Sequence, residues 1–317
     1  MSAPALPATM PRVARPSVRG RGDRLGSLVE IWFRAHSGLV YLFLYAPILV
    51  VVLFAFNDTE GAAARWEGFS TRWFGIALDD PVVRKSLTNS FIVAIPNAVL
   101  ATAFGTMAAL GLQRVGRRVR LGFDMLTYMS VIVPEIVIAL ATLVLFATGF
   151  DAIESATGIK LKFGYPTIIA AHVLFNTSLV LLLVRARLSG MDRTLAEASE
   201  DLFATPWRTF RQITFPLLLP AIVAGFLLSF TFSFDDYVIT TFVSGPGSST
   251  LPLFIFGQVR RGVTPETNAV ATMILGFTLA MLLVGQIFLI WQARRAGRRG
   301  AGMAAVVGAE AEEPPAG

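Results

Sequence analysis

Apolar residues in this chain gather into six long stretches that are separated by short polar segments. The stretches lie at 37–56, 91–112, 125–148, 165–184, 216–243 and 269–291. An α-helix needs about 20 mostly apolar residues to cross roughly 30 Å of hydrocarbon, and each stretch reaches that length. The pattern therefore predicts an all-α membrane protein with six transmembrane helices.

The composition agrees with this prediction. Of the 317 residues, 54% are hydrophobic and 15% are charged, whereas soluble chains have about 25% charged residues. The chain has no cysteine and two histidines, His36 and His172, which excludes disulfides, thiol nucleophiles and histidine-rich metal clusters. Most basic residues stand between apolar blocks. The net charge is +6. The placement of the basic residues indicates that they orient the chain in a lipid bilayer and do not bind nucleic acid.

Basic residues are distributed unevenly between alternate loops. Nineteen of the 27 lysines and arginines lie in the N-terminal tail, the loops after the second and fourth spans, and the C-terminal tail. Cytoplasmic loops carry such an excess, so both termini are predicted to be cytoplasmic, which six spans also require. We expect a disordered basic tail at 1–35, a transmembrane domain at 36–295 and a second disordered tail at 296–317.

The segment 190–215, after the fourth span, is polar and is not itself a span. It is predicted to form two short helices. Asp192 suits the N-cap of the first helix, and Thr205 followed by Pro206 suits the start of the second. Apolar residues at three- and four-residue spacing give the segment a stripe that needs a partner surface. The stripe either packs on the cytoplasmic face of this chain or docks a separate cytoplasmic subunit.

This segment resembles the cytoplasmic signature loop of ABC-importer permeases, which runs Glu-Ala-Ala, three residues, Gly, nine residues, Ile-x-Leu-Pro. The matching residues here are Glu197-Ala198-Ser199, Phe203 at the glycine position, and Ile213-Thr214-Phe215-Pro216. Phe203 departs from the motif, because the family's glycine lies at the bend between the two helices. A left-handed backbone at a phenylalanine costs about 1–2 kcal/mol. The resemblance implies that an ATPase is contacted through Glu197, Ala198, Ser199, Phe203, Trp207, Ile213 and Pro216.

A second stretch resembles the putrescine/spermidine branch of the same permeases. It runs from Ser233-Phe234-Asp235-Asp236-Tyr237 through Gly245-Pro246-Gly247 to Val259-Arg260-Arg261-Gly262, within a likeness that covers about residues 85–290. The resemblance implies the six-span type I ABC-importer permease fold in a bacterial inner membrane, and no enzymatic activity in this chain. It also implies three kinds of partner: a second homologous permease subunit, two copies of a cytoplasmic ABC ATPase and an extracytoplasmic substrate-binding protein.

Nucleotide chemistry is assigned to another chain. No Gly-x-x-x-x-Gly-Lys-Ser/Thr phosphate loop occurs in this sequence. The chain has three lysines, and Lys85, which precedes a serine, follows Arg84 where the loop requires glycine. ATP and Mg are therefore expected on the partner ATPase, and no cofactor or metal is expected in this chain.

Ionisable residues inside the predicted spans are candidates for the transport path. Inserting an aspartate at the centre of a transmembrane helix costs about 2.5–3.5 kcal/mol. A structural or functional role is therefore expected for the adjacent Asp235 and Asp236. On a continuous helix Asp236 shares a face with Ser229, Ser233 and Thr240, which makes one polar stripe along the fifth span. The aspartates either line a water-filled path, or one of them caps a helix break or pairs with an arginine.

Three other groups have two interpretations each. Glu135 follows Pro134 near the middle of the third span, where it either faces the cavity or is protonated and bonded to freed backbone groups. His172 and Asn176 are one turn apart in the fourth span, and an interhelical hydrogen bond is the simpler interpretation. Tyr237 either holds an organic ammonium by cation–π attraction or packs against other apolar side chains.

The resulting hypothesis is the membrane-spanning subunit of an ATP-driven importer for a small organic cation, a polyamine such as putrescine or spermidine. Its expected path residues are Asp235, Asp236, Tyr237, Glu135 and Ser233. One alternative is a permease of the same class for another small organic solute. Others are an ion-coupled secondary transporter, in which the buried acids relay protons or cations, and a membrane scaffold without transport.

Overall fold

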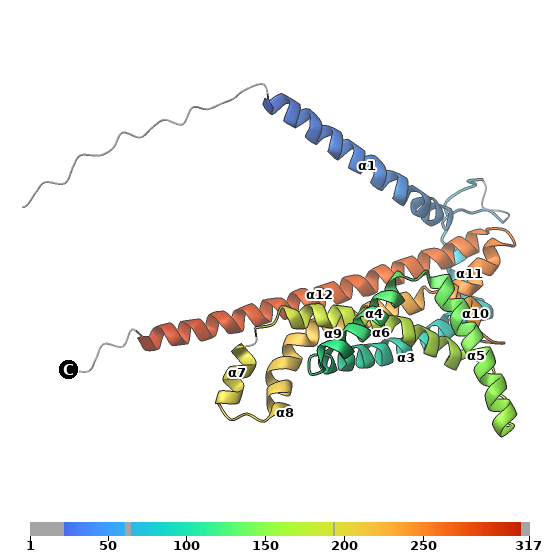
Figure 1. Ribbon diagram of the computed structural model, residues 1–317. Helices are drawn as coiled ribbons and strands as arrows, with labels where there is room; N and C mark the ends of the chain where they lie inside the picture. Colours follow the sequence, from blue (N-terminus) through green and yellow to red (C-terminus); the bar gives the residue numbers. More distant parts are fainter. Residues whose placement is uncertain (1–21, 61–64, 193, 312–317) are drawn as a thin grey trace, which may run out of the picture. The chain divides into compact units, whose positions relative to one another are not determined.

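The structure, a computed structural model, describes residues 22–60, 65–192 and 194–311 (Figure 1). Regular secondary structure in these residues is helical, apart from one isolated bridge between Asn57 and Phe69. The helices are α1 (Gly22–Phe54), α2 (Arg72–Asp79), α3 (Pro81–Gly111), α4 (Arg117–Ile132), α5 (Glu135–Thr157), α6 (Tyr165–Ser189), α7 (Thr194–Asp201), α8 (Pro206–Thr209), the π-helix η1 (Phe210–Thr214), α9 (Phe215–Phe234), α10 (Val238–Val243), α11 (Leu251–Val259) and α12 (Pro265–Ala311). The chain divides between Val51 and Val52 into two compact units.

Six of the described helical stretches are long and apolar enough to cross a membrane, which confirms the predicted number of spans. They are Val29–Phe54, Pro81–Gly111, Glu135–Thr157, Tyr165–Ser189, Pro206–Phe234 and Pro265–Trp291. Each overlaps one of the six apolar stretches in the sequence. Length and hydropathy were therefore sufficient to locate the spans, although not all of their ends.

The third span lies further along the chain than predicted, because the helix breaks at Pro134. Proline favours an extended conformation at the preceding residue, and Val133 has a ψ of 132°. Helix α4 therefore ends at Ile132, and α5 begins at Glu135 as a separate helix. The expectation that Glu135 lies near the middle of the third span is wrong, since Glu135 is the first residue of its helix.

Helices extend into both segments for which disordered tails were predicted. Helix α1 begins at Gly22 and α12 continues to Ala311, whereas residues 1–21 and 312–317 lie outside the described residues. Arginine and alanine, which are frequent in both segments, are good helix formers. Arg34 Nη2 also lies 2.5 Å from Glu30 Oε1, four residues earlier on α1. The described helices therefore extend beyond residues 36 and 295, while the boundaries of the transmembrane domain stay a prediction.

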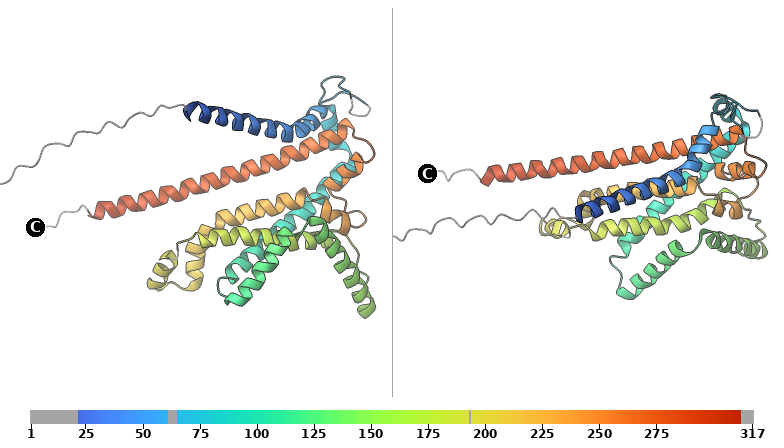
Figure 2. Two further views of the ribbon diagram at one scale, coloured as in Figure 1. Left: turned by 45° about the horizontal axis from the view of Figure 1, so that its top comes forward. Right: turned by 90° about the horizontal axis from the view of Figure 1, so that it is seen from above.

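Helices α3, α6 and α9 form the packed centre of the second unit (Figures 1 and 2). They meet at Val180 of α6, which is fully buried. A Cβ added at Gly105 of α3 would lie 2.7 Å from Val180 Cβ, and one added at Gly225 of α9 would lie 3.2 Å from Val180 Cγ1. Small residues allow such close helix approach within membranes. This contact sets the register of the three helices that carry the polar residues described next.

The fifth span is interrupted near its end. Helix α9 ends at Phe234 and α10 begins at Val238, so residues 235–237 form a break between them. Helix α10 packs against α5 and α6. The single continuous helix predicted over 216–243 is therefore wrong at this point, because the chain changes direction at the two aspartates.

Candidate functional site

Polar side chains from α9, α10 and the break between them converge on His172 of α6, which is 1% exposed. His172 Nδ1 lies 2.7 Å from Ser233 Oγ, and His172 Nε2 lies 3.0 Å from Asp236 Oδ2. The Thr240 hydroxyl lies 3.3 Å from the same Nε2. Each ring nitrogen therefore has a polar partner, as a buried imidazole requires. We call these four residues the His172 cluster.

Within the His172 cluster, Asp236 caps the start of α10. Its carboxylate accepts hydrogen bonds from the backbone N–H groups of Ile239 at 3.2 Å and Thr240 at 2.7 Å. It also accepts one from the Thr240 hydroxyl at 2.7 Å. The first N–H groups of a helix have no partner inside the helix, and an acid that accepts from them stabilises the helix start. This geometry matches the capping interpretation of Asp236, and His172 ties the cap to α6.

Asp235 has a different environment from its neighbour. It is exposed, and together with Tyr237 and Phe256 it lines a shallow pocket of about 300 Å³ between the helix break and α11. The ring centroids of Tyr237 and Phe256 are 4.0 Å apart, and the Arg260 guanidinium lies 5.1 Å from the centre of the Phe256 ring. One aspartate of the pair is thus enclosed by hydrogen bonds, and the other faces open space beside two aromatic rings.

Glu135 adds a second carboxylate beside Asp236. Helix α5, which begins at Glu135, packs against α10, and the Glu135 side chain lies next to the Asp236 carboxyl group. Glu135 is itself exposed. The start of α5 and the helix break thus place two acidic side chains next to each other.

Buried polar side chains continue from this site between the helices. Asn97 Nδ2 of α3 donates to the backbone carbonyl of Ser229 at 2.9 Å, and Asn176 Nδ2 of α6 donates to Asn97 Oδ1 at 3.2 Å. The interhelical hydrogen bonds predicted for His172 and Asn176 are therefore present. Asn97 was not among the predicted site residues, although an asparagine that follows Pro96 inside an apolar stretch was a usable signal.

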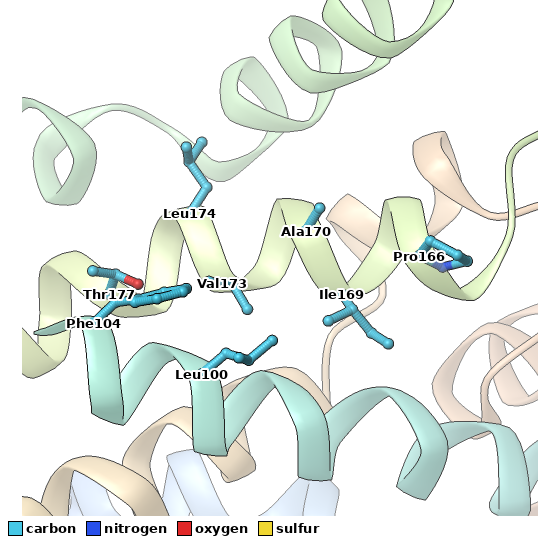
Figure 3. Close-up of a pocket in the computed structure, with 8 residues that line it drawn as sticks. All are labelled: Leu100, Phe104, Pro166, Ile169, Ala170, Val173, Leu174 and Thr177. Carbon is cyan, nitrogen blue, oxygen red and sulfur yellow. The ribbon is translucent and has the colours of Figure 1, made fainter. Parts of the chain in front are cut away.

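A larger groove between α3 and α6 is unsuited to a cation. Its volume is about 710 Å³, and it is lined by apolar side chains and by Thr177. Figure 3 shows Leu100 and Phe104 of α3 opposite the side chains of α6. No charged residue of the described part of the chain lines this groove, so the groove offers a cation no opposite charge.

The segment 190–215 folds into a helical hairpin made by α7 and α8 (Figure 1). Pro206 is the first residue of α8, and Thr205 Oγ1 accepts from the backbone N–H of Arg208 at 3.4 Å, which confirms the predicted start of this helix. At the start of α7, Asp192 Oδ1 accepts from the backbone N–H of Thr194 at 2.9 Å. Hydrogen bonds from the Thr194 hydroxyl and backbone hold the pKa of Asp192 below its usual range.

The bend of the hairpin lies where the signature glycine is replaced. Phe203 has a φ of 59°, and no other non-glycine residue in the described part of the chain has a positive φ. The N–H of Phe203 donates to the Glu200 carbonyl at 2.8 Å, and that of Ala204 donates to the Ser199 carbonyl at 3.1 Å. This is the Schellman arrangement that ends many helices, usually with glycine in the left-handed position. The predicted bend is therefore present, with phenylalanine in glycine's conformation.

The predicted coupling residues differ in exposure. Ser199 is buried, and its hydroxyl lies 2.9 Å from that of Thr209, which links the two arms of the hairpin. Ile213 is half-buried in η1. The exposed members of the set are Glu197, Ala198, Phe203, Trp207 and Pro216. Most of the signature side chains of the hairpin are therefore exposed in this chain.

Comparison with known proteins relates this fold to transport. The chain matches the family described as binding-protein-dependent transport system inner membrane component over residues 101–298. It is 42% identical over 254 residues to the putrescine transport system permease protein PotI of Escherichia coli K12, which covers 80% of this chain and 87% of that protein. It is 34% identical over 248 residues to the spermidine/putrescine transport system permease protein PotC of the same strain, covering 78% and 90%.

Solved structures show the same architecture. A bacterial ABC transporter involved in the import of the acidic polysaccharide alginate matches with a TM-score of 0.68 at 12% identity, covering 84% of this chain and 98% of that chain. A bacterial alginate ABC transporter in complex with an alginate pentasaccharide-bound periplasmic protein matches with a TM-score of 0.66 at 14% identity. At these identities the likeness shows the fold alone, which is the type I importer permease fold.

The family and its relatives decide between the candidate functions that the sequence left open. They are importers with separate binding proteins, so an ion-coupled secondary transporter and a scaffold without transport are not supported. The six apolar helices agree with a multi-pass protein of the inner membrane. This chain belongs to the binding-protein-dependent transport system inner membrane component family, and it is the permease subunit of an ABC importer.

Proposed function

We propose that this chain forms part of the membrane path for a polyamine, with putrescine as its main cargo. The observation that carries this proposal is the 42% identity to a putrescine permease over 80% of the chain. Both chain termini are cytoplasmic, because the tails and the hairpin carry the excess of basic residues. The complete importer contains a second homologous permease, two copies of an ATPase that bind ATP and Mg, and an extracytoplasmic binding protein. The chain itself catalyses no reaction.

The acids at the helix break support a cationic cargo. Charged groups at membrane depth face the interior of a bundle or a water-filled cavity, since exposure to lipid is costly. Asp235 is exposed in this chain, so it faces water or the partner permease in the assembled importer. An ammonium group beside Asp235 also meets the Tyr237 ring, and such a cation–π contact contributes about 0.5–2 kcal/mol.

The path residues predicted from sequence take two different roles in this proposal. Asp235, Tyr237 and Glu135 contact the moving cation, because their side chains are exposed or half-buried. Asp236 and Ser233 are held by His172, so they support the helix break that presents Asp235 and Tyr237. The helix break therefore positions side chains that line the cation path.

The cargo proposal predicts that Asp235→Asn lowers putrescine uptake about tenfold, which corresponds to about 1.4 kcal/mol. The substitution keeps the size of the side chain and removes its charge. Uptake of labelled putrescine into proteoliposomes that contain the complete importer measures the effect. Asp151→Asn, an exposed aspartate on α5 away from the break, is the matched control. Equal uptake by the two variants would remove Asp235 from the path.

We propose that the hairpin at 190–215 receives the motion of the partner ATPase. Glu197 is exposed on α7, and hydrogen bonds to charged groups contribute about 1.5–3 kcal/mol. Glu197→Ala is therefore expected to weaken ATPase binding to the permease at least tenfold. Co-purification and binding-protein-stimulated ATP hydrolysis measure this loss, with Glu67→Ala in the loop after the first span as control. Unchanged assembly and unchanged hydrolysis in Glu197→Ala would contradict the docking role.

A further inference from the structure

The tip of the hairpin combines backbone strain with exposed apolar side chains. Phe203 is in the left-handed region with a φ of 59°, and it is 96% exposed. Its neighbour Leu202 is 82% exposed, and Trp207 on the other arm is 69% exposed. Exposed apolar side chains are common singly on protein surfaces, but a group of large ones marks an interaction site.

The left-handed backbone and the exposed ring of Phe203 both lower the stability of the hairpin in the absence of a partner. A left-handed backbone is unfavourable for any residue that carries a Cβ, whereas glycine adopts it freely. The hydrogen bonds from Phe203 to Glu200 and from Ala204 to Ser199 hold the backbone in that conformation. Glycine at this position would remove the strain and the exposed ring together. Strain that is maintained by surrounding structure tends to mark functional positions. We therefore expect the ring to contact a partner outside this chain.

The two arms of the hairpin also carry exposed charged residues. Helix α7 exposes Glu197, Glu200 and Asp201 on one side of the bend, and the second arm exposes Arg208 and Arg211. An apolar centre within a charged rim is typical of protein–protein interfaces. Large buried aromatic side chains carry much of the binding energy at such interfaces.

We propose that Phe203 is an anchor that inserts into an apolar pocket of the partner ATPase and makes this permease selective for an ATPase with such a pocket. The inference rests on the proposed docking of the hairpin. The hydrogen bond between Ser199 and Thr209 links the two arms before binding, and Trp207 stacks on Phe210 within the second arm. A rigid presentation of the ring reduces the entropy that binding costs.

The test uses a substitution for which strain relief and loss of the anchor predict opposite results. Phe203→Gly relaxes the bend, so affinity for the ATPase stays equal or rises if the ring has no partner. We expect affinity to fall about 30-fold, which corresponds to about 2 kcal/mol. Phe203→Leu is expected to recover part of that loss. Leu202→Ala changes a neighbour that is also exposed but has no positive φ, and it is expected to lose less than about threefold affinity. Affinities are measured by titrating purified ATPase onto the permease pair in nanodiscs.

Three outcomes separate the anchor from its alternatives. Lower affinity of Phe203→Gly, with hydrogen exchange still slow at the Ala204 amide, supports the anchor. Equal or higher affinity overturns it while leaving the docking role intact. Lower affinity together with fast exchange at Ala204 attributes the effect to a changed bend and also overturns it. If the unaltered permease does not bind the ATPase at all, the proposed docking role itself fails.

Discussion

Asp236→Ala is expected to destabilise the permease by about 3 kcal/mol or more, because each buried polar group left without a hydrogen-bond partner costs about 1–3 kcal/mol. His172 Nε2 loses its acceptor, and the N–H groups of Ile239 and Thr240 at the start of α10 lose theirs. These groups are buried, so water does not readily replace the carboxylate. The unfolding temperature of the purified permease in detergent measures the loss.

Asp235→Ala is the matched control for this prediction. It removes the same side chain one residue earlier, at an exposed position of the same helix break. Substitutions at exposed positions usually change stability by less than about 0.5 kcal/mol. If both alanine variants unfold at the same temperature, Asp236 is not the residue that holds the break.

Gly245→Ala is expected to destabilise the permease by about 3 kcal/mol or more, at the upper end of the range for overpacked sites. A Cβ at Gly245 would lie 1.9 Å from the Phe163 carbonyl oxygen and 2.4 Å from its carbon. Both are backbone atoms, so no rotamer change relieves the clash. The adjoining loop also depends on this position, because the Gly247 carbonyl accepts from Asn89 Nδ2 at 3.1 Å and from the Tyr165 hydroxyl at 3.2 Å.

Gly257→Ala tests whether the effect at Gly245 comes from close packing. Gly257 lies inside α11, and no atom lies within 4 Å of an added Cβ. Alanine there is expected to be neutral or to stabilise the helix by up to about 1 kcal/mol. The yield of folded permease and its rate of proteolysis are the measurements for both variants. Comparable behaviour of the two would show that the loop at Gly245 has room to move.

The transmembrane helices illustrate what local sequence patterns predict and where they fail. Hydropathy is averaged over a window of side chains. It therefore located all six spans but gave no information about the helix break at Pro134. The third span consequently begins at Glu135 and extends to Thr157. The signal was present in the sequence, because proline disfavours helical conformation in the residue before it. A prediction that treated Pro134 as a boundary would have placed Glu135 at a helix start.

The different burial of the two aspartates could not be predicted from the sequence. Asp235 and Asp236 are adjacent and chemically identical, so no local rule says which of them is buried. Asp236 meets His172, which lies 64 residues earlier on α6, while Asp235 faces a pocket beside Tyr237. This division depends on how α6, α9 and α10 pack, and the close contact of Gly225 with Val180 brings α9 against α6.

The sequence by itself determined the six-span helical class, the basic bias of alternate loops and the hairpin with its signature residues. These properties follow from transfer free energies and capping chemistry, which act residue by residue along the chain. Only the tertiary structure decided that the fifth span breaks at the aspartates, that Asp236 caps α10 and that Asp235 stays open. The local bonds from Asp236 to α10 are joined by the long-range bonds of Asp236 and Ser233 to His172, and the free energy of these long-range contacts exists only once the helices have packed.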